Sequence, residues 1–94
     1  MLTHSELKKL LKYDPDTGIF TWSKPTSTRV KKGSIAGTGD HGYIQIVINK
    51  KRYLAHRLAW FYMTEKWPDC GIKHINGILE DNRFCNLKEG SLKQ

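Results

Sequence analysis

The sequence predicts an α+β fold, with a small antiparallel sheet, an N-terminal and a central helix, and a C-terminal ββα unit in which a hairpin leads into a helix. Apolar residues recur at helical spacing in two segments, and they alternate with polar residues in a third. Turn-forming residues separate these segments. A chain of 94 residues suffices for one modest core. We therefore expect one domain over 1–94, divided into a helix and sheet region (1–55), a central helix (56–69) and the ββα unit (70–94).

The N-terminal segment LTHSELKKLLKY, residues 2–13, is typical of a helix. Thr3 is suited to cap it, and Glu6 stands three residues later, as a capping box requires. Pro15 disfavours helical geometry in the residue before it and so ends the helix. A strand is expected next, over IFTW at residues 19–22.

Residues 23–42 are rich in Ser, Thr, Gly and Lys, and we interpret them as an excursion with a short strand near residues 34–38. The following stretch YIQIVI, residues 43–48, alternates strictly, so its isoleucines should face the core. Asn49 and Lys50 fit a two-residue hairpin turn that returns the chain through KRYLA. The expected result is a sheet of about three strands with one apolar face.

From residue 56 the period becomes helical in HRLAWFYMTEKW, and Pro68 is expected to stop this helix. Its predicted inner stripe comprises Leu58, Ala59, Tyr62 and Met63. His56 opens the helix, where a structural hydrogen-bonding role is the favoured interpretation and a ligand role the alternative.

The C-terminal part predicts a strand with His74, a turn at Asn76 and Gly77, a second strand, and a short helix from about residue 81 or 82 to 89. Such an arrangement gathers His74, Asn82 and Asn86 around one phosphate or one ion. For Asn82, helix capping is the favoured role and catalysis the alternative.

Sixteen Lys and Arg against nine Asp and Glu give a net charge of +7, which favours a polyanionic partner such as double-stranded DNA. The expected DNA-binding residues are Arg29, Lys31, Lys32, Gln45, Lys50, Lys51, Arg52, Lys73, Arg83 and Lys88. Among them, Gln45 and Arg52 suit base edges in a major groove. No apolar run reaches the length of a membrane span and the N-terminus lacks a signal-peptide pattern, so we expect a cytoplasmic protein with no membrane partner.

Several sequence blocks, in order, resemble the phage-type HNH endonucleases, which are related to intron-encoded homing enzymes and built around a hairpin-helix metal site. The blocks are YDPDTGIFTW, GSIAGT, GYIQIVI, AHRLAW, HING, DNR and NLKE. The resemblance implies phosphodiester cleavage in which His74 takes a proton from the attacking water. It also implies that Asn86 holds the hairpin to the helix and orients that histidine.

Two departures from the family pattern concern the metal. The family has an aspartate directly before the catalytic histidine, where this chain has Lys73, and a later ligand position would fall beyond Gln94. Repulsion thus replaces attraction for a divalent cation. Glu80 or Asp81 could substitute, or the Lys73 ammonium could stabilise the transition state directly. We expect no firmly bound cofactor, and Mg²⁺ or Mn²⁺ only if the protein cleaves.

The leading hypothesis is therefore an HNH-type DNA-binding protein with an incomplete metal centre and weak or absent cleavage. The alternative is a nuclease-dead phage protein that inhibits a host nucleic-acid-targeting defence complex such as a CRISPR effector. A basic structural domain without a DNA role is a third possibility. The sequence is compatible with a monomer or a homodimer.

Overall fold

The computed structural model describes residues 2–24, 31–40, 42–68 and 71–90. In chain order the elements are α1 (His4–Leu10), β1 (Leu11–Asp14), β2 (Ile19–Trp22), β3 (Ile35–Ala36), β4 (Thr38–Asp40), β5 (Tyr43–Ile48), β6 (Lys51–Leu54), α2 (Ala55–Thr64), β7 (Gly71–His74), the 3₁₀ turn η1 (Phe84–Asn86) and β8 (Leu87–Gly90). Neither α-helix in these residues has the length and apolar composition of a membrane span.

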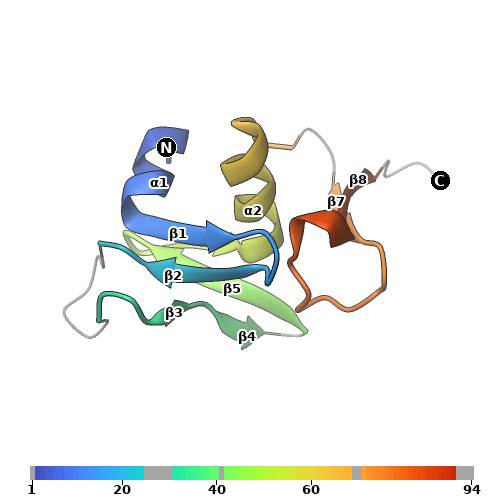
Figure 1. Cartoon of the computed structure of the whole chain (residues 1–94), viewed down its shortest axis with the longest axis horizontal. Helices are drawn as coiled ribbons and strands as arrows, with labels where there is room; N and C mark the ends of the chain where they lie inside the picture. The colour runs from blue at the N-terminus through green and yellow to red at the C-terminus, as the bar shows by residue number, and fades with distance from the viewer. Residues whose placement is uncertain (1, 25–30, 41, 69–70, 91–94) are drawn as a thin grey trace.

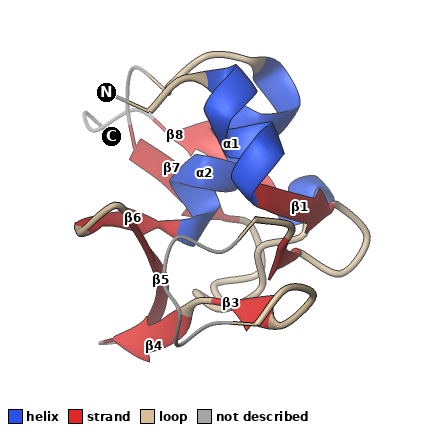
Figure 2. Ribbon diagram, turned by 90° about the vertical axis from the view of Figure 1, so that its left-hand side faces the viewer, coloured by secondary structure: helices blue, strands red, loops and turns tan. Residues whose placement is uncertain are grey.

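Within the described ranges, the strands form three antiparallel sheets in the orders β1-β2-β3, β4-β5-β6 and β7-β8. Helices α1 and α2 lie together on one side of the molecule, and β3 and β4, which continue the sheets from β2 and β5, are the strands farthest from the helices (Figures 1 and 2). Strands β7 and β8 form one end of the molecule. The α+β class is confirmed. The prediction of one sheet of about three strands underestimated the number of strands, because β1 and β4 were missed.

Helix α1 begins with the predicted capping box. The Thr3 hydroxyl accepts from the Glu6 amide at 3.1 Å, and the Glu6 carboxylate accepts from the Thr3 amide at 3.3 Å. The helix ends at Leu10, three residues before the predicted end. From Leu11 the chain is extended and pairs with β2, with Leu11 and Tyr13 buried and the residues between and after them exposed. Strand pairing thus overrides the helical spacing of the leucines.

The β5–β6 hairpin is confirmed in its strands, turn and faces. Ile46 and Ile48 are each 1% exposed, whereas Val47 is 50% exposed. The turn residues Asn49 and Lys50 have φ values of 50° and 69°, as a two-residue turn with two left-handed positions requires.

Helix α2 turns a different face inward from the one predicted. Its buried residues are Ala55, His56, Leu58, Ala59 and Phe61, whereas Met63 is 40% exposed, so its place in the inner stripe was wrong. The helix also ends before Pro68. Glu65 takes a left-handed conformation with φ 64° and donates to the Phe61 carbonyl at 2.9 Å, which closes the last turn.

The predicted hairpin-helix order at the C-terminus is wrong for the described residues. A long loop, residues 75–83, follows β7, and η1 then leads into β8, which pairs back on β7 with His74 opposite Leu87. Side chains satisfy the loop backbone in place of a partner strand, for example where Asn76 Oδ1 accepts from the Ile78 amide at 2.9 Å. The loop therefore stays irregular, and no α-helix forms at 82–89.

Candidate functional site

His74 ends β7 with its imidazole turned toward the interior, where it is 9% exposed. Its Nε2 lies 2.8 Å from Asn82 Oδ1, a buried hydrogen bond across the 75–83 loop. An amide oxygen only accepts, so Nε2 carries the proton in this bond. The remaining nitrogen, Nδ1, is then the one that can take up a proton.

Asn82 is 2% exposed and lies in the irregular stretch before η1, so it begins no helix. The favoured capping role was therefore wrong. Its side chain is the hydrogen-bond partner of His74, a task that the sequence analysis gave to Asn86 by resemblance.

Asn86 instead ties the loop together. Its Nδ2 donates to Asn76 Oδ1 and to the Asp81 carbonyl, both at 2.9 Å, while its Oδ1 accepts from the Asn76 amide at 3.0 Å. Its own carbonyl accepts from the Ile75 amide at 2.8 Å. These bonds hold both ends of the loop that runs from His74 to η1.

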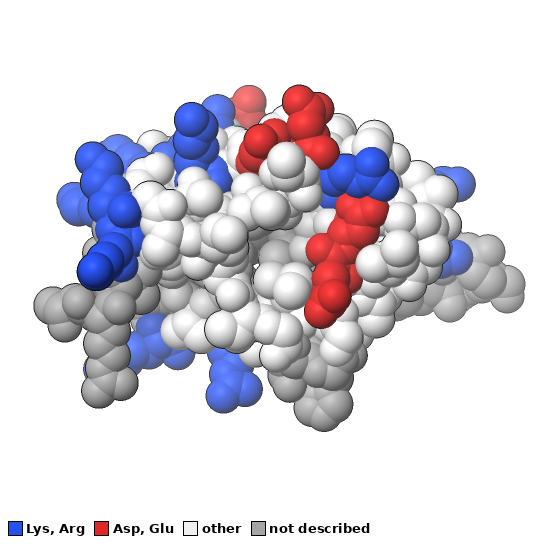
Figure 3. Space-filling view, turned by 60° about the horizontal axis from the view of Figure 1, so that its bottom comes forward, with Lys and Arg blue, Asp and Glu red and all other residues white. Residues whose placement is uncertain are grey.

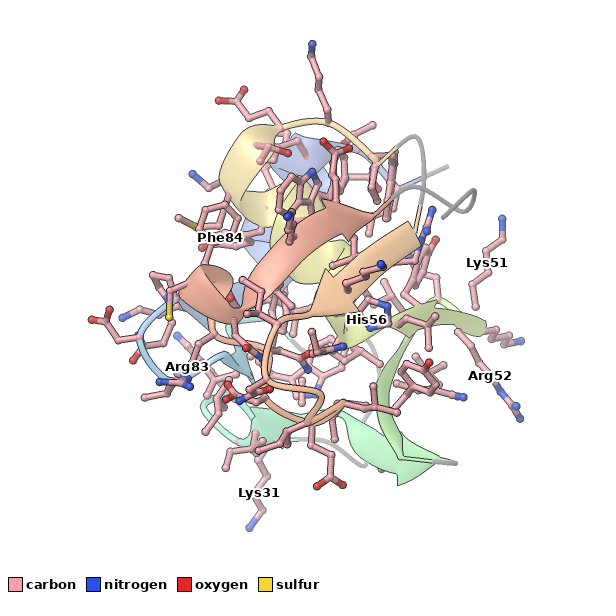
Figure 4. All side chains as sticks on the ribbon, turned by 90° about the vertical axis from the view of Figure 1, so that its right-hand side faces the viewer. Lys31, Lys51, Arg52, His56, Arg83 and Phe84 are labelled. Atoms are coloured by element: carbon pink, nitrogen blue, oxygen red, sulfur yellow. The ribbon has the colours of Figure 1, made fainter. Side chains whose placement is uncertain are left out.

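His56, from the first turn of α2, completes the buried cluster. Its ring centroid lies 4.9 Å from that of His74 and 5.5 Å from that of Tyr43, and it is 5% exposed. Burial, followed by the nearby His74 and Arg57, lowers the pKa of His56 to about 4, so this ring is neutral at pH 7. Its Nδ1 has no hydrogen-bond partner among the described residues. Figure 4 shows His56 behind the β7–β8 ribbon.

Lys73 faces away from this cluster. Along β7 the burial alternates, with Ile72 and His74 inward and Lys73 exposed. The aliphatic part of Lys73 lies over Gly90 of β8, where an added Cβ would come within 2.7 Å of Lys73 Cγ. Its directly opposite residue in the ribbon is Lys88, also exposed. The Lys73 ammonium is therefore not directed at the buried His74 ring.

The described residues do not fit a divalent cation. They contain no group of three or more His, Cys, Asp or Glu side chains that could hold a metal ion. The Asp81 carboxylate already receives two hydrogen bonds from the Arg83 guanidinium, at 2.8 and 2.7 Å, and one from the Asn76 side chain at 2.8 Å. The Arg83 guanidinium, foremost, holds the pKa of the Asp81 carboxyl well below its usual range. Glu80 instead borders a separate cavity of about 120 Å³ beside Asn82.

The expected DNA-binding residues that the structure describes lie on more than one face of the sheet. Lys31 and Gln45 border a shallow groove of about 440 Å³ together with Val47, whose side chain is 50% exposed. Arg52 pairs directly with Val47 across the hairpin and so lies on the same side of the sheet. Lys51 turns to the other face, beside Glu6. Figure 4 shows the Lys51 and Arg52 side chains diverging.

The remaining candidates fall in different settings. Lys32 and Lys50 are exposed in turns, and Arg29 lies outside the described residues. Arg83 is ion-paired with Asp81 at 2.7 Å. Figure 3 shows Asp and Glu side chains gathered on one part of this face and most of the Lys and Arg side chains elsewhere. On the face drawn in Figure 3, the described Lys and Arg side chains do not form one patch.

Residues 53–94 match the family model described as HNH endonuclease, which supports a nuclease-type relationship for the part from β6 through β8. No curated protein and no solved structure matched the chain. The match includes His56, His74, Asn82 and Asn86 but not the region from α1 to β5.

Proposed function

We propose that this protein binds double-stranded DNA as a phage-type member of the HNH group and that its cleavage of phosphodiester bonds is weak or absent. The observation that carries the proposal is the alternation on β7. The strand keeps the family's histidine turned inward, but it presents a lysine to solvent where the family has a carboxylate.

Binding requires only that cations reach phosphates and release counterions. The net charge of +7 supports this, as does the pair of exposed lysines, Lys73 and Lys88, at directly opposite positions of the ribbon. Two like charges opposite each other destabilise an isolated sheet, and a phosphate between or beside them would relieve that repulsion. The groove with Gln45 and Lys31 is a second candidate contact, suited to base edges.

Cleavage makes stricter demands. A general base must come within hydrogen-bond reach of the water it activates. His74 as a residue is only 9% exposed, and its Nε2 is engaged by Asn82. A metal centre that could offset this arrangement does not fit the described residues. Efficient catalysis would therefore need the 75–83 loop to open.

The test combines supercoiled-plasmid nicking, with magnesium or manganese present, and DNA binding measured by fluorescence anisotropy. We expect wild type to bind a DNA duplex with a salt-dependent Kd and to nick little or nothing. Any true nicking should fall at least about 100-fold in His74→Ala, the lower range of general-base contributions. Lys73→Asp should weaken DNA binding, and Lys9→Asp on exposed α1 provides the same charge change away from the ribbon as a control.

A second candidate function is inhibition of a host defence complex that handles nucleic acid, such as a CRISPR effector. The enclosure of His74 and the poor fit for a metal favour it, because an inhibitor needs the basic surface and not the chemistry. Pull-down from nuclease-treated host lysate separates the two. A defined nucleoprotein complex recovered in stoichiometric amount would favour inhibition, and recovery of only DNA from untreated lysate would favour the first proposal.

A further inference from the structure

The turn between β1 and β2 presses directly on the loop that carries Asn82. Gly18, with φ +76°, leaves no room for a side chain, since a Cβ there would lie 2.3 Å from both Arg83 N and Asn82 C. In the same turn, the Pro15 carbonyl accepts from the Phe84 amide at 3.1 Å. The backbone of the β1–β2 turn is thus in direct contact with the backbone of residues 82–84, although the two stretches are far apart in the sequence.

Tyr13 adds the central bond of this contact. It projects from β1, is 4% exposed, and donates its hydroxyl to the Asn82 carbonyl. Its ring is held between Phe20 and Tyr62, with centroid separations of 4.7 and 5.6 Å. Burial, aided by nearby acidic groups, raises the pKa of the Tyr13 phenol, so it remains protonated and continues to donate.

The consequence is that three points hold the backbone around Asn82. The Asn82 carbonyl is bound by Tyr13, the peptide that follows lies against Gly18, and the Phe84 amide is bound by Pro15. The side chain of Asn82 then accepts the hydrogen bond from Nε2 of the His74 ring. None of residues 13, 15 and 18 lies within the part that matches the HNH family.

We propose that Tyr13 is a positioning residue for His74. By holding the main chain of Asn82, it fixes the amide oxygen that keeps the proton on Nε2 and leaves Nδ1 as the basic nitrogen. The inference rests on the proposed role of His74 in this site, but its geometry is independent of whether the site cleaves DNA. By this inference, the region of the chain before α2 helps to determine which nitrogen of His74 carries the proton.

The experiment measures the imidazole nitrogens of His74 by long-range ¹H–¹⁵N NMR in wild type, Tyr13→Phe and Tyr53→Phe. Tyr53 is the control, a half-buried tyrosine that stacks on Trp67 at 6.0 Å, away from the Asn82 loop. Wild type should show the Nε2-protonated tautomer. Tyr13→Phe should shift His74 toward a mixture of tautomers and speed exchange of the Nε2 proton about tenfold, equivalent to about 1.4 kcal/mol of opening free energy. Tyr53→Phe should change neither.

Unchanged His74 tautomer and exchange in a folded Tyr13→Phe variant would overturn the proposal. If that variant does not fold, amide exchange in wild type decides instead. The Phe84 amide should be as protected as the paired amides of β1 and β2, because its acceptor belongs to their turn. Exchange as fast as in an open loop would refute the contact. Neither readout uses DNA, so absent DNA binding would overturn the proposed function and leave this inference standing. An unchanged His74 tautomer would overturn this inference and leave the proposed function standing.

Discussion

Replacing Gly18 by alanine should destabilise the protein far more than the same change at Gly77. The two glycines have nearly the same left-handed backbone, with φ +76° and +78°. A Cβ at Gly77 would meet no atom within 4 Å, whereas at Gly18 it would collide with the backbone of Asn82 and Arg83. The pair therefore separates backbone strain from the contact between the β1–β2 turn and the 75–83 loop.

The magnitude follows from these two terms. The left-handed conformation costs a residue with a Cβ about 1–2 kcal/mol, and this term applies at both positions. At Gly18 the turn must also withdraw from the loop, which breaks the hydrogen bonds from Tyr13 to Asn82 and from Phe84 to Pro15. At about 1 kcal/mol net for each bond, the loss for Gly18→Ala is roughly 3–4 kcal/mol, against about 1–2 kcal/mol for Gly77→Ala.

Urea unfolding followed by tryptophan fluorescence measures both variants against wild type. The expected difference between them, about 2 kcal/mol, is well above the error of such fits when the slopes agree. Equal losses in the two variants would show that the turn does not press on the loop, and they would also count against Tyr13 as a positioning residue.

Stability should also depend on pH through His56. The pKa of His56 is about 4 in the folded state against an ordinary value near 6.5, so the unfolded chain binds the proton more readily. The stability that the neutral His56 ring provides is therefore complete above pH 6.5 and is lost as the pH falls to about 4. Between pH 7 and pH 4, the free energy of unfolding measured in urea should fall by about 3 kcal/mol less in His56→Phe than in wild type. An equal fall in the two proteins would contradict the lowered pKa of His56. For DNA binding, the double variant Lys73→Ala/Lys88→Ala should lower the slope of log Kd against log salt by about 0.9 for each phosphate contact removed, and an unchanged slope would place the ribbon outside the interface.

The sequence predicted best those parts of the fold that depend on neighbours in the chain. The capping box of Thr3 and Glu6 and the turn at Asn49 and Lys50 are settled within a few residues, and both are confirmed. The start of β1 at Leu11 was missed because its pairing partner, Trp22, lies beyond a turn, and helical spacing alone gives no sign of that partner.

The sequence predicted which residues of the candidate site lie near one another, but not which of them are hydrogen-bonded. His74, Asn82 and Asn86 do gather in one place, yet the first partner of His74 is Asn82 and not Asn86. The path of an irregular loop determines which of the two asparagines reaches the His74 ring. Neither the alternation of a strand nor the spacing of a helix predicts such a path. A structural role was the favoured interpretation for His56. Its ring lies 4.9 Å from that of His74 because α2 packs against β7, a contact between distant segments that the sequence pattern does not predict.

The ribbon of β7 and β8 gives its register unusual importance. Its outermost described pair is Gly71 opposite Gly90, which offers no side chains to interlock. Because neighbouring residues of a strand point to opposite faces, a slip by a single residue would exchange an imidazole for an ammonium in the interior. The Asn86 bonds to Asn76 and the Asn82 bond to His74 oppose that slip. Two asparagines thus determine which of two adjacent side chains, His74 or Lys73, lies in the core and which lies in solvent.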